Sequence, residues 1–371
     1  MNPWLFIGMI SGTSRDGVDA ALVSFKGDKP EVRQAVCLPY PRGLAQELNR
    51  LVTSGQRPGK GVREELDARL ADHFCDTVMH LLQKAAVNER EITAIGSHGQ
   101  TVWHDPDGPN PESVQLGDPA RIAQKTGILT VGDFRLADIE AGGQGAPLAP
   151  LLHRALFQPS SDSAMPARVV LNLGGIANIS VISRDGDVAG YDTGPANCLM
   201  DAWVGLHRGE AFDRDGRWAA GGKILTHLLE AFLADPYFQR PAPKSTGIEY
   251  FNMAWLQRFR LDSQFDVCDV QTTLAELTAV SVADAIRLHS PGDVLVCGGG
   301  AHNRYLIRRL QALMPDVPVR STADHGLDPD WVEAVLFAWL ARERLAEKEL
   351  DTRGITGARH KVLLGKIAVP H

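Results

Sequence analysis

Hydrophobic and polar positions follow two different periods along this chain. Short apolar runs at 5–10 and 18–23 flank a small polar turn, which predicts a β-hairpin at the start of the chain. Between 64 and 85, apolar residues recur every three or four positions, which predicts a long helix with one buried face. The run 92–96 predicts a buried strand. Strands that alternate with helices in this way predict an α/β fold.

Capping signals predict where two further helices begin. Asp118 followed by Pro119 is typical of a helix N-terminus, and Gly127 is typical of its end. Farther along, Thr273 and Glu276 have the spacing of a capping box. We therefore expect one helix to begin at Pro119 and another near Thr273.

The second half of the chain opens in the same way as the first. A strand over 168–173 is followed by the turn Gly174-Gly175 and by a second apolar run at 178–182. A later strand, 293–297, leads into three consecutive glycines, 298–300, and then into an amphipathic helix. The two halves share this order of elements but no detectable sequence repeat.

The length of 371 residues suggests two domains, because single hydrophobic cores stop growing near about 250–300 residues. The polar segment 160–166 is typical of a surface linker. We therefore predict domains over 1–160 and 161–371, and we expect that the final helix or tail can pack back on the first domain.

Charge and cysteine content narrow the class of protein. A net charge of −7 argues against a nucleic-acid partner, which normally requires a basic face. The five cysteines form no C-x-x-C pair, so we expect reduced thiols and no zinc site. Neither a signal peptide nor a long apolar span is evident. We expect a cytoplasmic protein without a membrane anchor.

The first hairpin turn combines glycines, hydroxyls and carboxylates. Its backbone amides and hydroxyls can donate to phosphate oxygens, and its carboxylates can orient the waters of a metal ion or a sugar hydroxyl. It is not a Walker loop, and the same residues would also suit an ordinary polar hairpin. The predicted phosphate-binding residues here are Gly12, Thr13, Ser14, Arg15, Asp16, Gly17, Val18 and Asp19.

Three later segments carry candidate chemistry. The turn Gly174-Gly175, with Asn178 after it, could form a second phosphate-binding hairpin or a plain tight turn. Asp192 follows an apolar stretch and precedes a helix, where it could act as a general base or simply begin the helix. The glycines Gly298, Gly299 and Gly300 could admit the ribose or base of a nucleotide. Together these elements predict an actin/hexokinase/Hsp70-type protein with two ribonuclease H-like cores and nucleotide bound in a cleft between the domains.

Longer motifs resemble one family within that superfamily, the anhydro-N-acetylmuramic acid kinases. The resemblance covers nearly the whole chain in the expected order. The matching segments are 8–19, 97–102, 115–147, 171–178, 192–195, 244–247 and 297–300.

The resemblance implies a reaction and roles for particular residues. Such enzymes use ATP, with Mg²⁺, and water to open the internal bridge of 1,6-anhydro-N-acetylmuramic acid and to phosphorylate O6, in peptidoglycan recycling. Asp192 matches the catalytic aspartate, which would deprotonate the water. His98 and Arg135 match substrate-side positions, and the Arg135 fork suits a carboxylate. Glu333, in a helix predicted over 330–348, is a second candidate catalytic carboxylate, or an exposed residue of a first turn. The family also implies a homodimer.

The chain departs from the family pattern at two positions. Arg15 stands where leucine is usual, and Ile248 stands where arginine is common. Arg15 adds positive charge beside the first phosphate turn. Two other functions stay open at this point: a hexose kinase of the same fold, which would not consume water, and an ATP-binding protein without enzymatic activity.

Overall fold

The computed structural model describes residues 4–12, 15–53, 57, 59–160, 165–242, 244–261 and 265–370. The chain folds as two units. Unit 1 comprises Met1–Leu156 together with Trp331–His371, and unit 2 comprises Phe157–Asp330. The C-terminal segment therefore packs with the first part of the chain. The assignment of 1–160 and 161–371 to two functional domains stays a prediction.

Unit 1 is built on a seven-stranded sheet. Its strands are β1 Leu5–Ser11, β2 Gly17–Lys26, β3 Lys29–Pro39, β4 Ile92–Asp105, β5 Glu112–Leu116, β6 Thr130–Gly132 and β12 Lys366–Ala368. Its helices are α1 Arg42–Thr53, α2 Lys60–Ala85, α3 Pro119–Thr126, α4 Leu136–Glu140, α5 Ala149–Phe157 (whose last residue belongs to unit 2), α11 Val332–Leu345 and α12 Arg353–Thr356, with the 3₁₀ helix η1 Glu89–Glu91.

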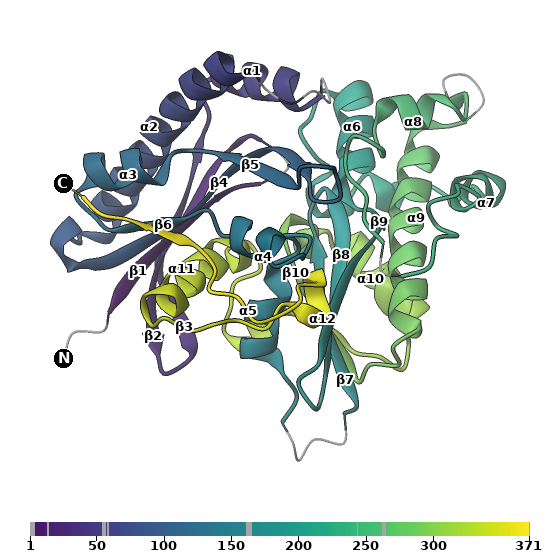
Figure 1. Ribbon diagram of the computed structural model, residues 1–371. Helices are drawn as coiled ribbons and strands as arrows, with labels where there is room; N and C mark the ends of the chain where they lie inside the picture. Colours follow the sequence, from purple (N-terminus) through teal and green to yellow (C-terminus); the bar gives the residue numbers. More distant parts are fainter. Residues whose placement is uncertain are drawn as a thin grey trace. The chain divides into compact units, whose positions relative to one another are not determined.

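The main strands of this sheet lie in the order β12-β6-β4-β1-β2-β3, and β5 pairs with β4 (Figure 1). β1, β2 and β3 form an antiparallel meander, whereas β4 and β6 run parallel to β1. Because the carboxyl ends of parallel strands meet at one edge, the segments that follow β1, β4 and β6 come together there.

Alternate residues of β1 face different helices. Ile7 and Met9 are fully buried in the core that α2 completes. Gly8, between them, faces the backbone of α11 around Ala334, on the other side of the sheet. This period of two places α2 and α11 on opposite faces of the unit 1 sheet.

Unit 2 is built on a five-stranded sheet. Its strands are β7 Ala167–Leu173, β8 Ile176–Ser183, β9 Val188–Pro195, β10 Asp293–Cys297 and β11 Val319–Ser321. Its helices are α6 Asn197–Arg208, α7 Thr226–Leu233, α8 Met253–Gln257, α9 Val267–Arg287 and α10 Arg304–Leu313, with 3₁₀ helices η2 Arg214–Gly216, η3 Ala219–Gly221, η5 Gly299–His302 and η6 Thr322–His325.

The two sheets share one topology. Unit 2 has the order β9-β8-β7-β10-β11, which matches β3-β2-β1-β4-β6 of unit 1 position by position. In both units three antiparallel strands are followed by two strands parallel to the first. The predicted fold class, two ribonuclease H-like cores in one chain, is confirmed.

Two elements differ from the sequence prediction. β4 does not end at residue 96 but continues to Asp105, because β5 pairs with its second half. α9 begins at Val267, not near Thr273, because the Asp266 side chain accepts the backbone N–H of Cys268 and caps the helix there. The prediction of a capping box at Thr273 is wrong, since the Thr273 hydroxyl donates to the carbonyl of Asp269 within the helix.

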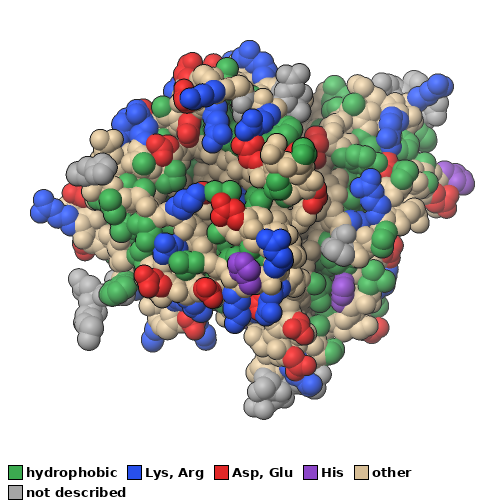
Figure 2. Space-filling view, viewed as in Figure 1, with side chains coloured by type: hydrophobic (Ala, Val, Ile, Leu, Met, Phe, Trp, Pro, Cys, Tyr) green, Lys and Arg blue, Asp and Glu red, His purple; other side chains and the backbone are tan. Residues whose placement is uncertain are grey.

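Surface charges are mixed on the face shown in Figure 2, where basic and acidic side chains alternate over short distances. In the part of the chain that the structure describes, no helix is both long enough and apolar enough to span a membrane.

Candidate active site

The first hairpin turn lies between β1 and β2 of unit 1. Thr13 and Ser14 lie outside the described residues. A side chain added at Gly12 would meet no atom within 4 Å, so the turn leaves room for a ligand on that side. Arg15 has a left-handed backbone (φ 53°), and its buried side chain donates from Nε to Oδ1 of Asn49 on α1 (2.7 Å). Arg15 is therefore attached to α1 by its side chain.

Two of the remaining hairpin residues are packed in the fold, and the other two are acidic residues nearer to solvent. Gly17 packs so closely on β3 that a Cβ would collide with the carbonyl of Leu38, and Val18 is fully buried in the core. Asp16 is exposed and Asp19 is half-buried. These two carboxylates are the acidic groups of the first hairpin turn.

A buried hydrogen bond joins the hairpin to the next strand. The Ser11 hydroxyl, at the end of β1, donates to Oε1 of Gln100 on β4 (2.6 Å). Both side chains are almost completely buried. This bond aligns the first hairpin turn with the part of β4 that carries His98.

Arg135 and His98, both predicted to lie on the substrate side, are joined by a hydrogen bond. Arg135 precedes α4, and its Nε donates to Nε2 of His98 (3.1 Å). Because Nε2 accepts, Nδ1 carries the proton and donates to the carbonyl of Gly99 (3.2 Å). Burial and the Arg135 charge hold the pKa of His98 well below its usual value. His98 is thus a neutral acceptor that orients the guanidinium, with its ring against Phe337 (4.7 Å).

The rest of the Arg135 guanidinium is available. Among the described residues, neither of its terminal nitrogens has a hydrogen-bond or ion-pair partner. Burial lowers the pKa of Arg135 to about 10, opposed by Glu333, so the group keeps its charge at neutral pH. A half-buried cation whose two terminal nitrogens have no partner among the described residues suits a planar anion such as a carboxylate.

Glu333 lies in the first turn of α11 and belongs to the same cluster. Glu333 is exposed, as the alternative interpretation of a first-turn residue expected, although the surrounding protein removes part of the water around its carboxylate. This desolvation, and then the negative charge of Asp19, raise the pKa of Glu333, whereas Arg135 lowers it. Within unit 1, Glu333 therefore lies near enough to Asp19 of the hairpin and to Arg135 for their charges to act on it.

In unit 2 the second turn and the triple glycine lie next to each other. Asn197, at the start of α6, donates from Nδ2 to the carbonyl of Leu173 (2.9 Å), and its backbone N–H donates to the carbonyl of Gly174 (3.0 Å). The backbone N–H groups of Ala196 and Cys198 both donate to the carbonyl of Gly175. The turn is therefore held against the N-terminus of α6 by backbone hydrogen bonds.

The three glycines after β10 have different reasons to be glycine. A Cβ at Gly298 or Gly300 would collide with Asn172 or Leu173 of β7, so these two glycines permit close packing on the end of that strand. A Cβ at Gly299 would meet nothing within 4 Å. Of the three, Gly299 is the residue with open space beside its Cα.

Asp192 lies on β9, opposite Asn178 of β8. Its Oδ2 accepts the backbone N–H of Thr246 (3.0 Å), and Oδ1 has no hydrogen-bond partner among the described residues. Burial raises the pKa of Asp192 to about 6, with a further rise from Glu249 and an opposing effect of the Thr246 amide. The residue is therefore an ionised base at neutral pH, with one oxygen fixed and one available.

Comparison with known proteins identifies the family. The family model for anhydro-N-acetylmuramic acid kinase matches residues 4–370. This chain belongs to the anhydro-N-acetylmuramic acid kinase family. Its curated relatives include proteins of that name from Pasteurella multocida (46% identical over 366 residues, 98% of this chain and 96% of the relative) and Xanthomonas campestris pv. campestris strain 8004 (46% over 368 residues, 98% and 97%).

Among solved structures, the chain resembles (R)-2-hydroxyglutaryl-CoA dehydratase component A from Acidaminococcus fermentans. The TM-score is 0.47 at 12% identity, over 92% of this chain and 99% of that one.

The sequence of this anhydro-N-acetylmuramic acid kinase family member did not predict the contacts of three residues around the site. Gln100, Asn197 and Thr246 all lie in or next to motifs that match the family, but no role was assigned to them. Their roles depend on bonds to residues 24 to 89 positions away, as for Asn197 to Leu173 and Ser11 to Gln100. The only local signal is the turn-forming run Lys244-Ser245-Thr246-Gly247.

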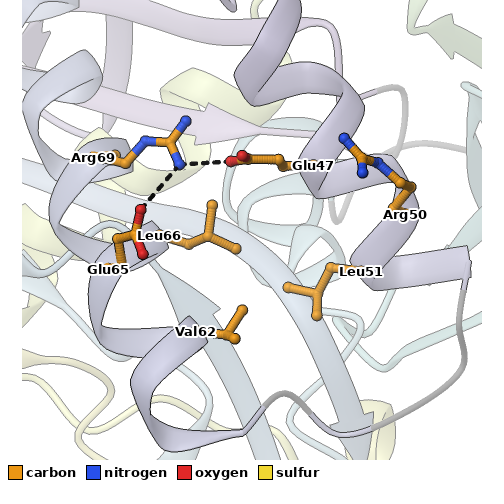
Figure 3. Close-up of a pocket in the computed structure, with 7 residues that line it drawn as sticks. All are labelled: Glu47, Arg50, Leu51, Val62, Glu65, Leu66 and Arg69. Atoms are coloured by element: carbon orange, nitrogen blue, oxygen red, sulfur yellow. Dashed lines mark hydrogen bonds and ion pairs between the residues drawn. The ribbon is translucent and has the colours of Figure 1, made fainter.

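A separate hollow of about 410 Å³ lies between α1 and α2 (Figure 3). Arg69 crosses it to reach Glu47 (2.6 Å) and Glu65 (3.6 Å). None of its seven lining residues is a predicted site residue. The hollow is distinct from the cluster of His98, Arg135 and Glu333.

Proposed function

We propose that this chain is an ATP-dependent kinase that hydrolytically opens 1,6-anhydro-N-acetylmuramic acid and phosphorylates it at O6. Water adds to the anomeric carbon, the bond from C1 to the bridging oxygen breaks, and that oxygen becomes O6. O6 then takes the γ-phosphoryl group of ATP. The products are N-acetylmuramic acid 6-phosphate and ADP, with one water consumed.

The geometry of Asp192 supports the hydrolytic step most directly. Ring opening by water needs a base that is ionised at neutral pH and yet strong enough to take a proton. A carboxylate with a pKa of about 6, fixed through Oδ2 and available through Oδ1, meets both requirements. Asp192 is therefore proposed to take the proton of the attacking water.

The unit 1 cluster is proposed to bind the sugar. A muramic sugar carries a lactyl carboxylate, and Arg135 offers two free donors of the matching geometry. His98 keeps the guanidinium in place through its neutral ring. The charges of both Arg135 and Asp19 shift the pKa of Glu333, and we propose that Glu333 holds a sugar hydroxyl or the water.

ATP is the proposed phosphoryl donor, and the hairpin residues fit its phosphates. The open sides of Gly12 and Gly299 leave room for close backbone approach. No group of three or more acidic, histidine or cysteine side chains among the described residues could hold a metal alone. Mg²⁺ usually binds through phosphates, waters and one or two carboxylates, and we propose that here it is held through the ATP phosphates and waters near Asp16. When bound, Mg²⁺ would neutralise charge on the phosphates.

Product mass tests this proposal. The protein would be incubated with 1,6-anhydro-N-acetylmuramic acid, Mg-ATP and ¹⁸O-labelled water. We expect a phosphosugar that carries one ¹⁸O at the anomeric carbon. A phosphosugar without ¹⁸O would contradict the hydrolytic step, and no phosphosugar despite ATP binding would contradict the substrate. A hexose panel then tests a hexose kinase, and no product with any sugar indicates an ATP-binding protein.

The pH dependence of kcat/KM should report the ionisation of Asp192. Because a raised pKa leaves this base protonated below about pH 6, we expect kcat/KM to fall as the pH decreases through that value. Glu249→Gln removes a negative charge that raises this pKa, so its acidic limb should move to lower pH. If Glu249→Gln left the acidic limb of kcat/KM at the same pH, or moved it to higher pH, the limb would not report the ionisation of Asp192.

The remaining parts of the proposal follow from the substrate and the family. The anhydro sugar is a fragment of the cell wall, so we place the reaction in peptidoglycan recycling in the cytoplasm. We also propose a homodimer, which sedimentation of the purified protein would test.

A further inference from the structure

Asp192 lies on an outer strand, where half of the backbone groups lack a partner in the sheet. β9 is the last strand of the unit 2 sheet, with β8 on one side only (Figure 1). The N–H and C=O of Asp192 nevertheless both have partners. The N–H donates to the carbonyl of Lys244 (3.0 Å), and the C=O accepts the hydroxyl of Tyr237 (2.7 Å). Backbone N–H and C=O groups that are removed from water are expected to have hydrogen-bond partners of this kind.

The same segment also holds the side chain of Asp192. The backbone N–H of Thr246 donates to Oδ2. Lys244, Tyr237 and Thr246 thus occupy, in that order, the backbone donor, the backbone acceptor and one carboxylate oxygen of Asp192. We call these three residues the Asp192 clamp.

The register of β9 makes such a clamp necessary. Asn178 pairs with Asp192 but Ala177 pairs with Gly194, so β9 has one extra residue, Thr193, directly after Asp192. A bulge of this kind interrupts the ladder and turns the neighbouring side chains. The sheet alone therefore does not fix the peptide plane that follows Asp192.

Two residues of the Asp192 clamp, Lys244 and Tyr237, also contact each other. The Lys244 ammonium lies over the Tyr237 ring (4.6 Å from its centre) and donates to the carbonyl of Tyr237 (3.2 Å). These contacts hold the two ends of the clamp together.

A buried carboxylate anchors the clamp to the rest of unit 2. Asp235 accepts hydrogen bonds from the Tyr237 N–H, the Tyr250 hydroxyl, the Trp255 indole and Arg258. Burial opposes ionisation of Asp235, but these bonds outweigh it and hold its pKa below the usual value. A satisfied buried network of this kind is rigid.

We propose that Tyr237 is a positioning residue for Asp192. Its hydroxyl fixes the peptide carbonyl after Asp192 at the bulge, and thereby keeps Oδ2 on the Thr246 amide and Oδ1 directed to the reacting water. The proposal rests on the proposed function only in naming Asp192 as the base. The contact itself is independent of that function.

Two matched substitutions test this role. Tyr237→Phe removes one hydroxyl and leaves the ring against Phe238 and Phe251. Tyr250→Phe makes the same change in the same aromatic cluster but loses a bond to Asp235 instead of Asp192. For Tyr237→Phe we expect kcat to fall about tenfold with KM for both substrates nearly unchanged, because small misplacement of a catalytic group is costly. Tyr250→Phe should leave kcat within about twofold, because Asp235 keeps its three other hydrogen bonds, the one from the Tyr237 N–H among them. Both variants should lower the unfolding temperature.

A second measurement does not depend on activity. Carbon NMR titration of the labelled aspartate carboxyls, with Asp192→Asn for assignment, gives the pKa of Asp192 in each protein. We expect Tyr237→Phe to raise this pKa, since the Thr246 amide that lowers it is held less firmly, and Tyr250→Phe to leave it in place. If Tyr237→Phe and Tyr250→Phe had the same kcat and the same pKa of Asp192 as each other, the proposal would be overturned. A wild-type protein that makes no phosphosugar would instead contradict the proposed function, and the titration would still decide the role of Tyr237.

Discussion

Asp192→Asn should lower kcat for phosphosugar formation by about 10²–10⁴-fold, the usual contribution of a general base. Asparagine has nearly the same shape and can still accept the Thr246 N–H through its carbonyl oxygen. It cannot take a proton from water. The loss should therefore fall on kcat, with KM for the sugar and for ATP within a few-fold of wild type.

The measurement is the initial rate of phosphosugar release with both substrates saturating. Asp187→Asn is a matched control, because Asp187 directly precedes the same strand at its other end and is exposed. It should keep full activity. If Asp192→Asn retained more than about a tenth of the wild-type kcat, another group would have to be the base. Glu333 would then be the first residue to examine.

Gly8→Ala and Gly96→Ala should each destabilise unit 1 by about 3 kcal/mol, at the upper end for overpacking. The two glycines are direct neighbours in the parallel pairing of β1 with β4. Both face α11, where a Cβ at Gly8 would collide with the carbonyl of Ala334, and a Cβ at Gly96 with the carbonyl of Phe337. Both obstacles are helix backbone, which cannot rotate away as a side chain can.

The expected result is a lower midpoint of urea unfolding, followed by circular dichroism. Activity should fall as well, since the displaced helix carries Glu333 and the Phe337 ring that contacts His98. Gly61→Ala, in the first turn of α2 with open space around it, is the control. It should be neutral or stabilising by up to about 1 kcal/mol. A midpoint unchanged in Gly8→Ala would mean that α11 does not pack on the sheet as described.

These glycines show that a strand can be predicted from local sequence while the need for glycine within it comes from a distant helix. Gly8 lies inside a predicted strand, where glycine normally weakens pairing. The sequence identified the strand from its apolar neighbours but offered no reason for the glycine. The reason is the close approach of a helix more than 320 positions farther along the chain.

Local patterns predicted those elements whose boundaries depend on local bonds. The Asp118 cap and the Gly127 end of α3 are as predicted, because the Asp118 side chain accepts the N–H of Ala120 and Gly127 has a left-handed backbone. The start of α9 was misplaced because two capping signals compete in that segment. Asp266 is the actual cap, and Glu276 instead pairs with Arg309 of α10 (2.6 Å).

By itself the sequence determined the family, the two hairpins with their turn glycines and the candidate residues, because these depend on residue types at short spacing. The tertiary structure decided which residues meet. It made His98 a neutral partner of Arg135, grouped the C-terminal helix with unit 1 so that Glu333 joins this pair, and bound Asp192 to a loop some fifty positions away. Those outcomes depend on burial and on hydrogen bonds between distant segments, which no local pattern of residue types encodes.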